Sequence, residues 1–395
     1  MRGSLVQRYP GRWSLILDLG YQTDPVSGTR KRKQQWITFH GTREAAEKAL
    51  TKLVGKVHDH EFVSPDKITV GEWLDSWCDL AIKPPLRAQR TYENYRGIIK
   101  KHFKPALGAI RLQDLQAVHL ERFNAESAKK GLSARTIRKH HTMLSTALKT
   151  AVRKKMVSRN VASDVDNVPR AQKEHPDVEA NCWEVHEAAQ FLKTAEAAGP
   201  QQAAFYTLAL EAGLRKSELC GLMWSDLTAG KLKVSRQLLR HTRGTPPTFG
   251  PLKNRTSRVV ELSTATLALL KTHRQHQAEV KLANRTQYHD HGLVFAREWA
   301  DPSVTGGTLG DPLQAASIGQ REFDGLIKAA GVRRIKFHGL RHTAATVALK
   351  TGVPAHVVKK RLGHQRIEIT LDIYAHCFDR DQHEAAESVS AVLHG

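Results

Sequence analysis

Residues 336–349 read KFHGLRHTAATVAL, and they place two imidazoles and a guanidinium at the start of an apolar helical run. His338 and His342 are four positions apart and could bind zinc from one helical face. The helical zinc-protease motif, however, requires Glu directly after the first His, where this chain has Gly339, and no third ligand stands at a telling spacing. His338 and Arg341 are three apart, so both can point from one helix end at the same phosphate. The stretch therefore favours an anion over a metal.

The composition points to a polyanionic partner. The chain has 395 residues, a formal net charge of +22 and a pI near 10.0. This length favours two or three domains. The positive charge is spread over the whole sequence, and such an excess strongly attracts a polyanion. Nucleic acid is the expected partner, and the alternative is a merely soluble basic protein.

The cysteines and the first residues indicate a cellular location. No two of the four cysteines form a CxxC pair, so the sequence predicts a reducing compartment without a disulfide framework or a cysteine-rich zinc site. The start, MRGSLVQRYPGRW, lacks the apolar core of a signal peptide, and no apolar run approaches membrane-spanning length. We expect a soluble, cytoplasmic protein without a membrane partner. The cysteines are Cys78, Cys182, Cys220 and Cys377.

The first part of the chain predicts a small sheet followed by a helix. The segments SLVQRY, GRWSLILDLGY and KQQWITFH are typical of strands, and DPVSGT is typical of a turn. Thr42 is suited to cap the helix that follows. The basic run RKRKQQW, residues 30–36, is expected at the turn of the sheet. Such a run is commonly a solvated hairpin, but beside an exposed sheet in so basic a chain it favours DNA contact.

A helical segment follows. Thr69 and Glu72 form a capping-box pattern. A further helix is expected to open at Thr91 and to close at Pro105 and Gly108. The last helix of this segment, residues 133–156, carries apolar residues at helical spacing on one face and basic residues on the other. A basic face of this kind is either a wet surface or part of a clamp on duplex DNA. The apolar residues are Ile137, Leu144, Leu148 and Val152, and the basic ones are Arg138, Lys139, His141 and Lys149.

Residues beyond this segment lose and then regain regular patterns. The stretch VASDVDNVPRAQKEHPDVEAN reads as a linker. From Trp183 onward the sequence predicts helices, strands near KLKVSRQLL and SRVVELS, and then helices again. This last part of the chain contains Arg, Lys, His and Tyr residues in short motifs that are candidates for function. In chain order they are Arg215 in EAGLRKSELCGLMWSD, Lys253 in PLKNRTSRVVEL, His338 and Arg341 in HGLRH, His364 in RLGHQ, and Tyr374 in TLDIYAH.

This order resembles the tyrosine recombinase family, the phage-type integrases. Its members carry an Arg in a GLRxxEL context, a β-hairpin Lys, an HxLR box, an LGH motif and a following Tyr. The resemblance implies that Arg215 and Arg341 stabilise the extra negative charge that a DNA phosphodiester gains during attack, a role for which guanidinium is well matched. It also implies a phosphate hydrogen bond from His364 and general-base assistance from His338.

The resemblance assigns Tyr374 as the nucleophile and Lys253 as the general acid that protonates the leaving 5′ oxygen. The loop LKNRTSR differs from the KTKSSRR that is frequent in the family. Lys231 and Lys233 therefore remain rivals of Lys253. Taken alone, each of these residues has a purely structural explanation. Its charge could interact favourably with the dipole at a helix end, or its side chain could belong to the core.

The resemblance covers the whole chain and implies a multidomain α+β fold. Residues 1–65 would form a small N-terminal β-sheet plus helix that binds arm sites, and residues 66–165 a helical SAM-like core-site domain. Residues 166–181 would be a linker. Residues 182–395 would form a mainly helical catalytic domain with a β-hairpin or small sheet.

The implied activity is site-specific recombination through a 3′-phosphotyrosyl intermediate, without cofactor, metal or ATP. The implied partners are double-stranded DNA with core and arm attachment sites, three further copies in a homotetramer, a host DNA-bending protein and an excisionase. The expected location is the cytoplasm of a bacterial host, at the nucleoid. Two alternatives are a type IB-like topoisomerase, which the arm-like first domain disfavours, and a catalytically inactive DNA-binding regulator, which the full set of polar residues disfavours.

Overall fold

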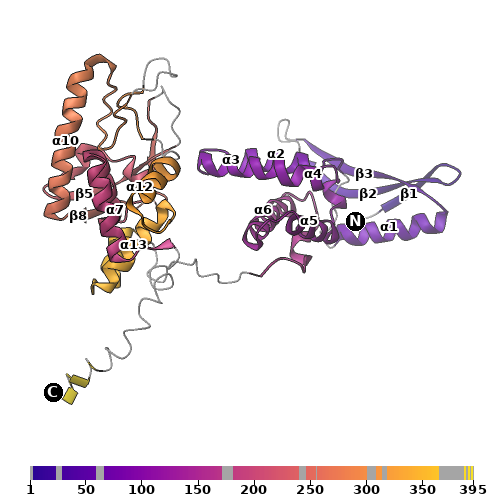
Figure 1. Ribbon diagram of the computed structural model, residues 1–395. Helices are drawn as coiled ribbons and strands as arrows, with labels where there is room; N and C mark the ends of the chain where they lie inside the picture. Colours follow the sequence, from indigo (N-terminus) through magenta and orange to yellow (C-terminus); the bar gives the residue numbers. More distant parts are fainter. Residues whose placement is uncertain are drawn as a thin grey trace. The chain divides into compact units, whose positions relative to one another are not determined.

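The computed structural model describes residues 3–23, 29–58, 66–170, 181–239, 246–254, 256–299, 308–313 and 318–363, together with residues 387, 390, 391, 393 and 394. The chain divides into two compact units, residues 1–173 and 174–395 (Figure 1). Among the residues described, no helix is both long and apolar enough to span a membrane.

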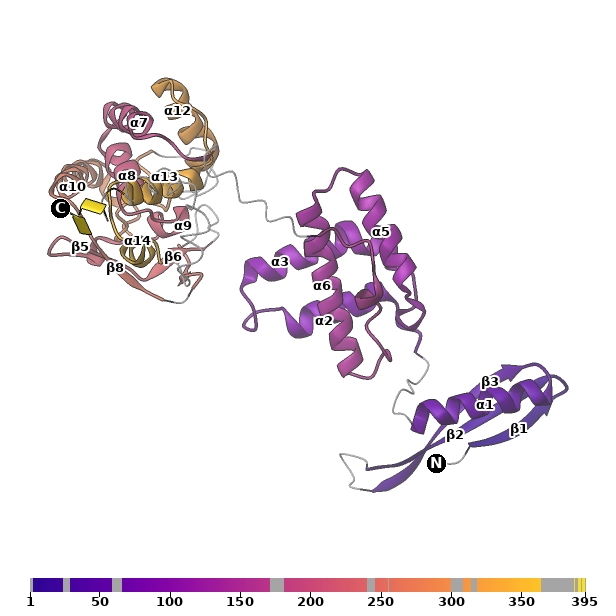
Figure 2. The same ribbon diagram turned by 90° about the horizontal axis from the view of Figure 1, so that it is seen from below.

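The first unit begins with an antiparallel sheet in the order β1-β2-β3, formed by Gly3–Tyr9, Arg12–Thr23 and Arg30–His40. Helix α1, Arg43–His58, lies along one face of this sheet (Figure 2). The strands and helix predicted here are confirmed. The predicted place of the basic run is wrong: residues 30–36 form the first half of β3 and pair with β2. Residues 24–28, where the sequence predicts a turn, lie outside the described residues.

A small core joins this sheet to α1. Trp13 and Leu15 of β2 are buried against Ala46 of α1. The indole N–H of Trp13 donates to the carbonyl oxygen of Gly41 at 3.0 Å, just before the helix begins. Thr42 accepts a hydrogen bond of 3.3 Å from the backbone N–H of Ala45, as the predicted cap requires.

The rest of the first unit is helical. Its helices are α2 Val70–Ala81, α3 Gln89–Ile98, α4 Lys104–Leu107, α5 Ala117–Lys129 and α6 Ala134–Arg153, with a π-helical turn over Ile99–Phe103. The core between them is dominated by large side chains that are almost fully buried, among them Trp73, Trp77, Phe103, Leu144 and Leu148.

The cap at the start of α2 is confirmed, because Thr69 and Glu72 form the predicted capping box. The predicted start of the next helix is wrong by two residues, because it begins at Gln89 rather than at Thr91. Its predicted close at Gly108 is confirmed: the helical turns run through Pro105 to Leu107, and Gly108 is the C-cap. Pro105 lies in the first turn after the π-helical turn. The hydrogen-bond register changes there, so the helix does not need the backbone N–H that proline lacks.

The second unit is mainly helical and contains two small sheets. Its helices are α7 Val185–Ala197, α8 Pro200–Glu211, α9 Lys216–Leu219, α10 Thr264–Asn284, α12 Phe323–Ala330, α13 Phe337–Lys350 and α14 Ala355–Leu362. One sheet has the order β4-β5-β8, Leu227–Thr228, Lys231–Val234 and Arg258–Glu261, and the other pairs β6, Arg236–Leu238, with β7, Phe249–Pro251.

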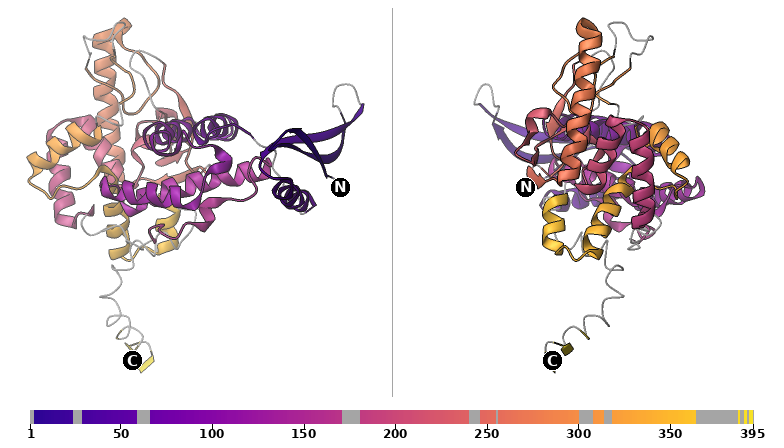
Figure 3. Two further views of the ribbon diagram at one scale, coloured as in Figure 1. Left: turned by 90° about the vertical axis from the view of Figure 1, so that its right-hand side faces the viewer. Right: turned by 60° about the vertical axis from the view of Figure 1, so that its left-hand side comes forward.

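Aromatic side chains fill the centre of this unit. Phe191 of α7, Tyr206 of α8, Phe323 of α12 and Phe337 of α13 pack against one another, with ring centroids 5.1–6.4 Å apart. Such pairs favour tilted and edge-to-face contacts. The long helix α10 packs against α8 and extends beside the loops that follow it (Figure 3). The core therefore fixes α8 and α13, the two helices that carry or adjoin the candidate site.

Candidate functional site

A buried carboxylate positions the first predicted arginine. Arg215 precedes the short helix α9, and its Nη1 donates to Oε1 of Glu218 at 2.8 Å. Arg258 of β8 donates to the other oxygen, from Nη2 to Oε2, at 2.7 Å. The side chains of Glu218 and Arg258 are 1% and 6% exposed, whereas that of Arg215 is 22% exposed. The carboxylate thus links two guanidinium groups, and Arg215 is the one that reaches the surface.

The ionised state of Glu218 is stable in this setting. Burial by itself would raise the pKa of its carboxyl group, but the hydrogen bonds and charge of Arg258, with the backbone N–H and charge of Arg215, outweigh burial and hold the pKa below its ordinary value. A buried carboxylate with this many charge-assisted donors is a rigid connection.

The second predicted arginine lies at the junction of three elements. Arg341 of α13 is 3% exposed, and its Nη1 and Nη2 donate to the backbone oxygens of Gly213 and Leu362, each at 2.6 Å. Gly213 has a φ of +59°, and a Cβ there would collide with Leu362. Glycine at this position therefore allows both the turn after α8 and the close approach of α14.

The neighbouring carbonyls at the end of α14 are held in the same way. Arg258 donates from Nε to the oxygen of Arg361 at 2.7 Å, and Asn254 donates from Nδ2 to the oxygen of Gly363 at 3.0 Å. Gly363 ends the helix with a φ of +68°. Three side chains from different elements thus fix the chain immediately before His364.

His338 lies in a strongly cationic setting. It is in the first turn of α13, and its ring centroid lies 5.0 Å from that of His342. The pKa of His338 is lowered to about 4 by the surrounding protein and by the charges of His342, Arg341, Arg215 and Lys253, in that order. Burial is the first cause of this shift, although His338 as a whole residue is exposed. Its ring is neutral at physiological pH and can accept a proton.

Lys253 is exposed on the connection between β7 and β8. Its charge is one of those that lower the pKa of His338. The rivals, Lys231 and Lys233, lie on β5. Lys231 pairs with Glu261 at 3.3 Å. Both rivals line a groove of about 980 Å³ between β8 and α14. The cationic residues along this groove are Lys231, Lys233, Arg258, Lys359, Lys360 and Arg361.

Four of the predicted catalytic residues are thus described, and the electrostatics of His338 connect it with Arg215, Lys253 and Arg341. The other two, His364 and Tyr374, lie outside the described residues. The alternative that His338 and His342 bind zinc gains no support. Among the described residues, the one group of potential metal ligands includes neither of these histidines.

Sequence reasoning missed the roles of Glu218, Arg258 and Asn254. The sequence of β8, RVVE, gives no alternating signal for Arg258; the structure shows that residues 258 and 260 are buried while 259 and 261 are exposed. An arginine on the buried side of such an alternation requires a buried partner. Nothing in the sequence identifies that partner as a residue forty positions earlier.

The basic face predicted for α6 is only partly free for DNA. Lys139 and Lys149 are exposed. Arg138 instead donates from Nε to the carbonyl oxygen of Pro169 at 3.0 Å, which ties the segment after α6 to the helix. His141 is half-buried, and burial lowers its pKa. The two lysines are thus the available cations of the predicted set.

Known proteins resemble this chain in sequence over most of its length. A relative named Integrase from Streptomyces ambofaciens is 29% identical over 377 residues, which cover 92% of this chain and 89% of that protein. A relative named Tyrosine recombinase XerC-like from Caldanaerobacter subterraneus subsp. tengcongensis is 26% identical over 372 residues, 90% of this chain and 91% of that protein.

Solved structures agree. The Tn1549 transposon integrase in complex with transposon right end DNA has a TM-score of 0.62 at 20% identity, covering 83% of this chain and 100% of that one. A lambda integrase tetramer bound to a Holliday junction has a TM-score of 0.55 at 17% identity, covering 92% of each chain. These likenesses confirm the predicted multidomain α+β fold.

Two family models match in the expected order. The model of a phage integrase N-terminal SAM-like domain matches residues 69–126, within the helical part of the first unit. The model of the phage integrase family matches residues 183–381, which include all six predicted catalytic residues. The chain therefore belongs to the phage integrase family, the tyrosine recombinases that its sequence resembles.

Proposed function

We propose that this protein is an integrase that cuts and rejoins DNA at specific sites through a covalent bond to Tyr374. The phenol oxygen would attack phosphorus, the bond from phosphorus to the 5′ oxygen would break, and the products would be a 3′-phosphotyrosyl enzyme and a free 5′ hydroxyl. Attack by the 5′ hydroxyl of another strand reverses the same step. The energy of the phosphodiester is kept, so the reaction needs neither ATP nor a metal ion.

The observation that carries this proposal is the fixed position of two guanidinium charges beside His338. Arg215 is held by Glu218, and Arg341 by the backbone of Gly213 and Leu362. Both charges lower the pKa of His338, so they lie within electrostatic range of its ring. Donors held rigidly before reaction stabilise developing charge without reorganisation during the step.

The remaining roles follow from position and acidity. His338, neutral at physiological pH, would take the phenol proton, because a phenol with an ordinary pKa near 10 is a weak nucleophile. Lys253 would protonate the leaving 5′ oxygen, and its charge acts on His338; Lys231 and Lys233 remain its rivals. His364 would add a hydrogen bond to the phosphate from the end of α14, which three side chains hold.

The two parts of the first unit would provide separate DNA contacts. Residues 66–165 would bind core sites, with Lys139 and Lys149 of α6 directed at the backbone of the duplex. Residues 1–65 would bind arm sites through the basic strand β3. When one chain binds two DNA segments, the second segment is bound at a raised effective concentration, provided that the linkers between the domains span both sites. Four copies would act together on two sites, aided by a host DNA-bending protein and, for excision, by an excisionase.

Recombination between two plasmids tests the proposal. Each plasmid carries one candidate attachment site, taken from the DNA on either side of the coding region, and no Mg²⁺ or ATP is added. We expect recombinant joints only when both sites are present. A type IB-like topoisomerase would relax any supercoiled plasmid without joining the two, and an inactive regulator would only bind; either result would refute the assignment.

A further inference from the structure

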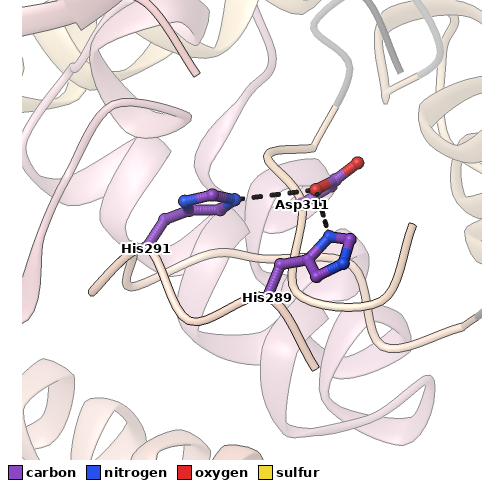
Figure 4. Close-up of side chains that lie close together, drawn as sticks. All are labelled: His289, His291 and Asp311. Carbon is purple, nitrogen blue, oxygen red and sulfur yellow. Dashed lines mark hydrogen bonds and ion pairs between the residues drawn. The ribbon is translucent and has the colours of Figure 1, made fainter. Parts of the chain in front are cut away.

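A cluster of two histidines and one aspartate lies in the second unit, outside the residues proposed for catalysis. His289 and His291 follow α10, and Asp311 lies in the short described segment 308–313 (Figure 4). The potential ligand atoms of these three side chains all lie within 4.8 Å of one another. Nothing in the proposed reaction uses them.

Backbone hydrogen bonds hold these segments together. The N–H of His289 donates to the oxygen of Leu309 at 2.9 Å, and the N–H of Arg297 donates to the oxygen of Asp311 at 2.8 Å. Gly310 has a φ of +84°, and a Cβ there would collide with the carbonyl oxygen of His289. Glycine thus permits the approach that places Asp311 beside both imidazoles.

The distances fit a metal site. Nδ1 of His289 lies 3.2 Å from Oδ1 of Asp311, and Nε2 of His291 lies 3.6 Å from the same oxygen. In a tetrahedral site with bonds of about 2.1 Å, neighbouring ligand atoms are about 3.4 Å apart. Both measured distances lie close to this value.

Hydrogen bonding alone leaves the cluster incomplete. His289 and Asp311 can share a hydrogen bond at 3.2 Å. The Nε2 atom of His291 is buried and has no hydrogen-bond partner, although it faces Asp311. Buried polar atoms are normally satisfied by a protein group, a water or an ion, and a metal ion between this atom and the buried carboxylate would satisfy it.

We propose that His289, His291 and Asp311 bind one divalent transition-metal ion of the zinc type. Imidazole nitrogen suits such ions, whereas Mg²⁺ prefers oxygen ligands. The two imidazoles are 36% and 24% exposed and Asp311 is 3% exposed, so solvent can supply a fourth ligand. One buried carboxylate and two neutral imidazoles also give the ion partial charge compensation.

The ion would stabilise the fold rather than enter the reaction. Just after the histidines, the oxygen of Gly292 accepts from the N–H of Trp224 at 3.0 Å, and the N–H of Val294 donates to the oxygen of Leu222 at 2.9 Å. The segment they join directly follows α9 and Glu218. A metal that ties residues 289–291 to residues 308–313 would therefore brace the segment that follows Glu218 in the chain.

Metal content of the full chain tests this proposal. The protein is prepared without a polyhistidine tag, incubated with Zn²⁺ alone, passed through gel filtration in metal-free buffer and analysed by mass spectrometry. We expect one zinc ion per chain in the wild type and in His186→Gln, a matched control that changes an exposed histidine of α7. We expect that ion to be lost in His291→Gln and in Asp311→Asn.

Thermal unfolding provides a second readout, and far-UV circular dichroism checks that each variant is folded. Excess Zn²⁺ should raise Tm by about 2–4 °C or more in the wild type and in His186→Gln, because an ion that binds only the folded state stabilises it. Mg²⁺ should cause no rise. The proposal is overturned if wild type retains no zinc, or if folded His291→Gln retains as much zinc and gains as much in Tm as the wild type.

Discussion

Arg341 donates a hydrogen bond of 2.6 Å to the backbone oxygen of Leu362, two residues before His364. The same guanidinium also holds Gly213, two residues before Arg215. One side chain of α13 therefore sets the position of both flanking segments. A change at Arg341 would displace its neighbours as well as remove its own charge.

The buried carboxylate of Glu218 should contribute strongly to stability. Glu218→Gln keeps the shape but leaves Arg258 as a buried, poorly compensated charge, so we expect the second unit to lose about 3–5 kcal/mol. The free energy of unfolding of this unit is measured in urea, with hydrogen exchange of the α8 amides as the probe. Glu261→Gln is the matched control, because Glu261 and Lys231 are 73% and 58% exposed, and it should cost less than about 1 kcal/mol. Equal losses in the two variants would contradict the buried network.

The contribution of Glu218 should depend on pH in a defined direction. Its pKa is lower in the folded chain than its ordinary value of 4.5. A group of this kind stabilises the fold fully above the unfolded pKa, and the stabilisation is lost as pH falls through the folded pKa. The stability difference between wild type and Glu218→Gln should therefore be constant from pH 7 to about pH 5 and shrink below it. A difference that grows as pH falls from 5 would contradict the assignment.

His338 should titrate near pH 4 in the free protein and at a higher pH when an anion is bound. Burial first, and then the cationic groups around it, oppose its protonation, and a DNA phosphate would offset the charge of those groups. NMR titration, with the His338→Gln variant to identify the signal, measures both midpoints. A midpoint near the ordinary value of 6.5 in the free protein, with no change on addition of an oligonucleotide, would mean that His338 does not share a site with the arginines.

Loss of Lys253 should be rescued by a better leaving group. Lys253→Ala should slow cleavage of ordinary DNA by about 10² or more, the usual scale for loss of a general acid. When sulfur replaces the bridging 5′ oxygen, the leaving group is a thiolate, which needs no proton. This substrate should recover most of the lost rate. Arg341→Ala should not be rescued. If the sulfur substrate leaves the Lys253→Ala defect intact, Lys231→Ala and Lys233→Ala should be compared in the same assay.

The N-terminal sheet should be needed for bridging and not for chemistry. Removal of residues 1–65 should preserve cleavage of core sites and abolish integration that depends on arm sites. The double change Arg30→Ala, Lys33→Ala keeps the sheet and removes two exposed cations of β3, so it should weaken arm-site binding and reduce its salt dependence. Normal integration by the truncated protein would show that this sheet does not bind arm sites.

Local features of the fold could be predicted from the sequence. Thr69 and Glu72 are three residues apart, and their capping box needs nothing beyond the first turn of α2. The π-helical turn over Ile99–Phe103 could not be predicted in this way. Its two ends, Ile99 and Phe103, are buried in a core formed by several helices, and Pro105 lies in the next turn.

The candidate site shows the same division. Short motifs in the sequence mark Arg215, His338 and Arg341 as candidates, whereas the weaker motif around Lys253 leaves Lys231 and Lys233 as its rivals. The carboxylate that joins Arg215 to Arg258, and the aspartate that meets His289 and His291, come from positions distant in sequence. Contacts between distant positions depend on tertiary packing, which residue spacing does not encode.

The central claim is that Tyr374 forms a covalent bond with DNA, and a nicked suicide substrate tests it most directly. On such a substrate the 5′ fragment diffuses away after cleavage, so the phosphotyrosyl product accumulates. Wild-type protein should form a denaturant-stable complex with the labelled core-site strand, and Tyr374→Phe should bind the same DNA with unchanged affinity and form no such complex. A denaturant-stable complex of normal yield with Tyr374→Phe would contradict the claim.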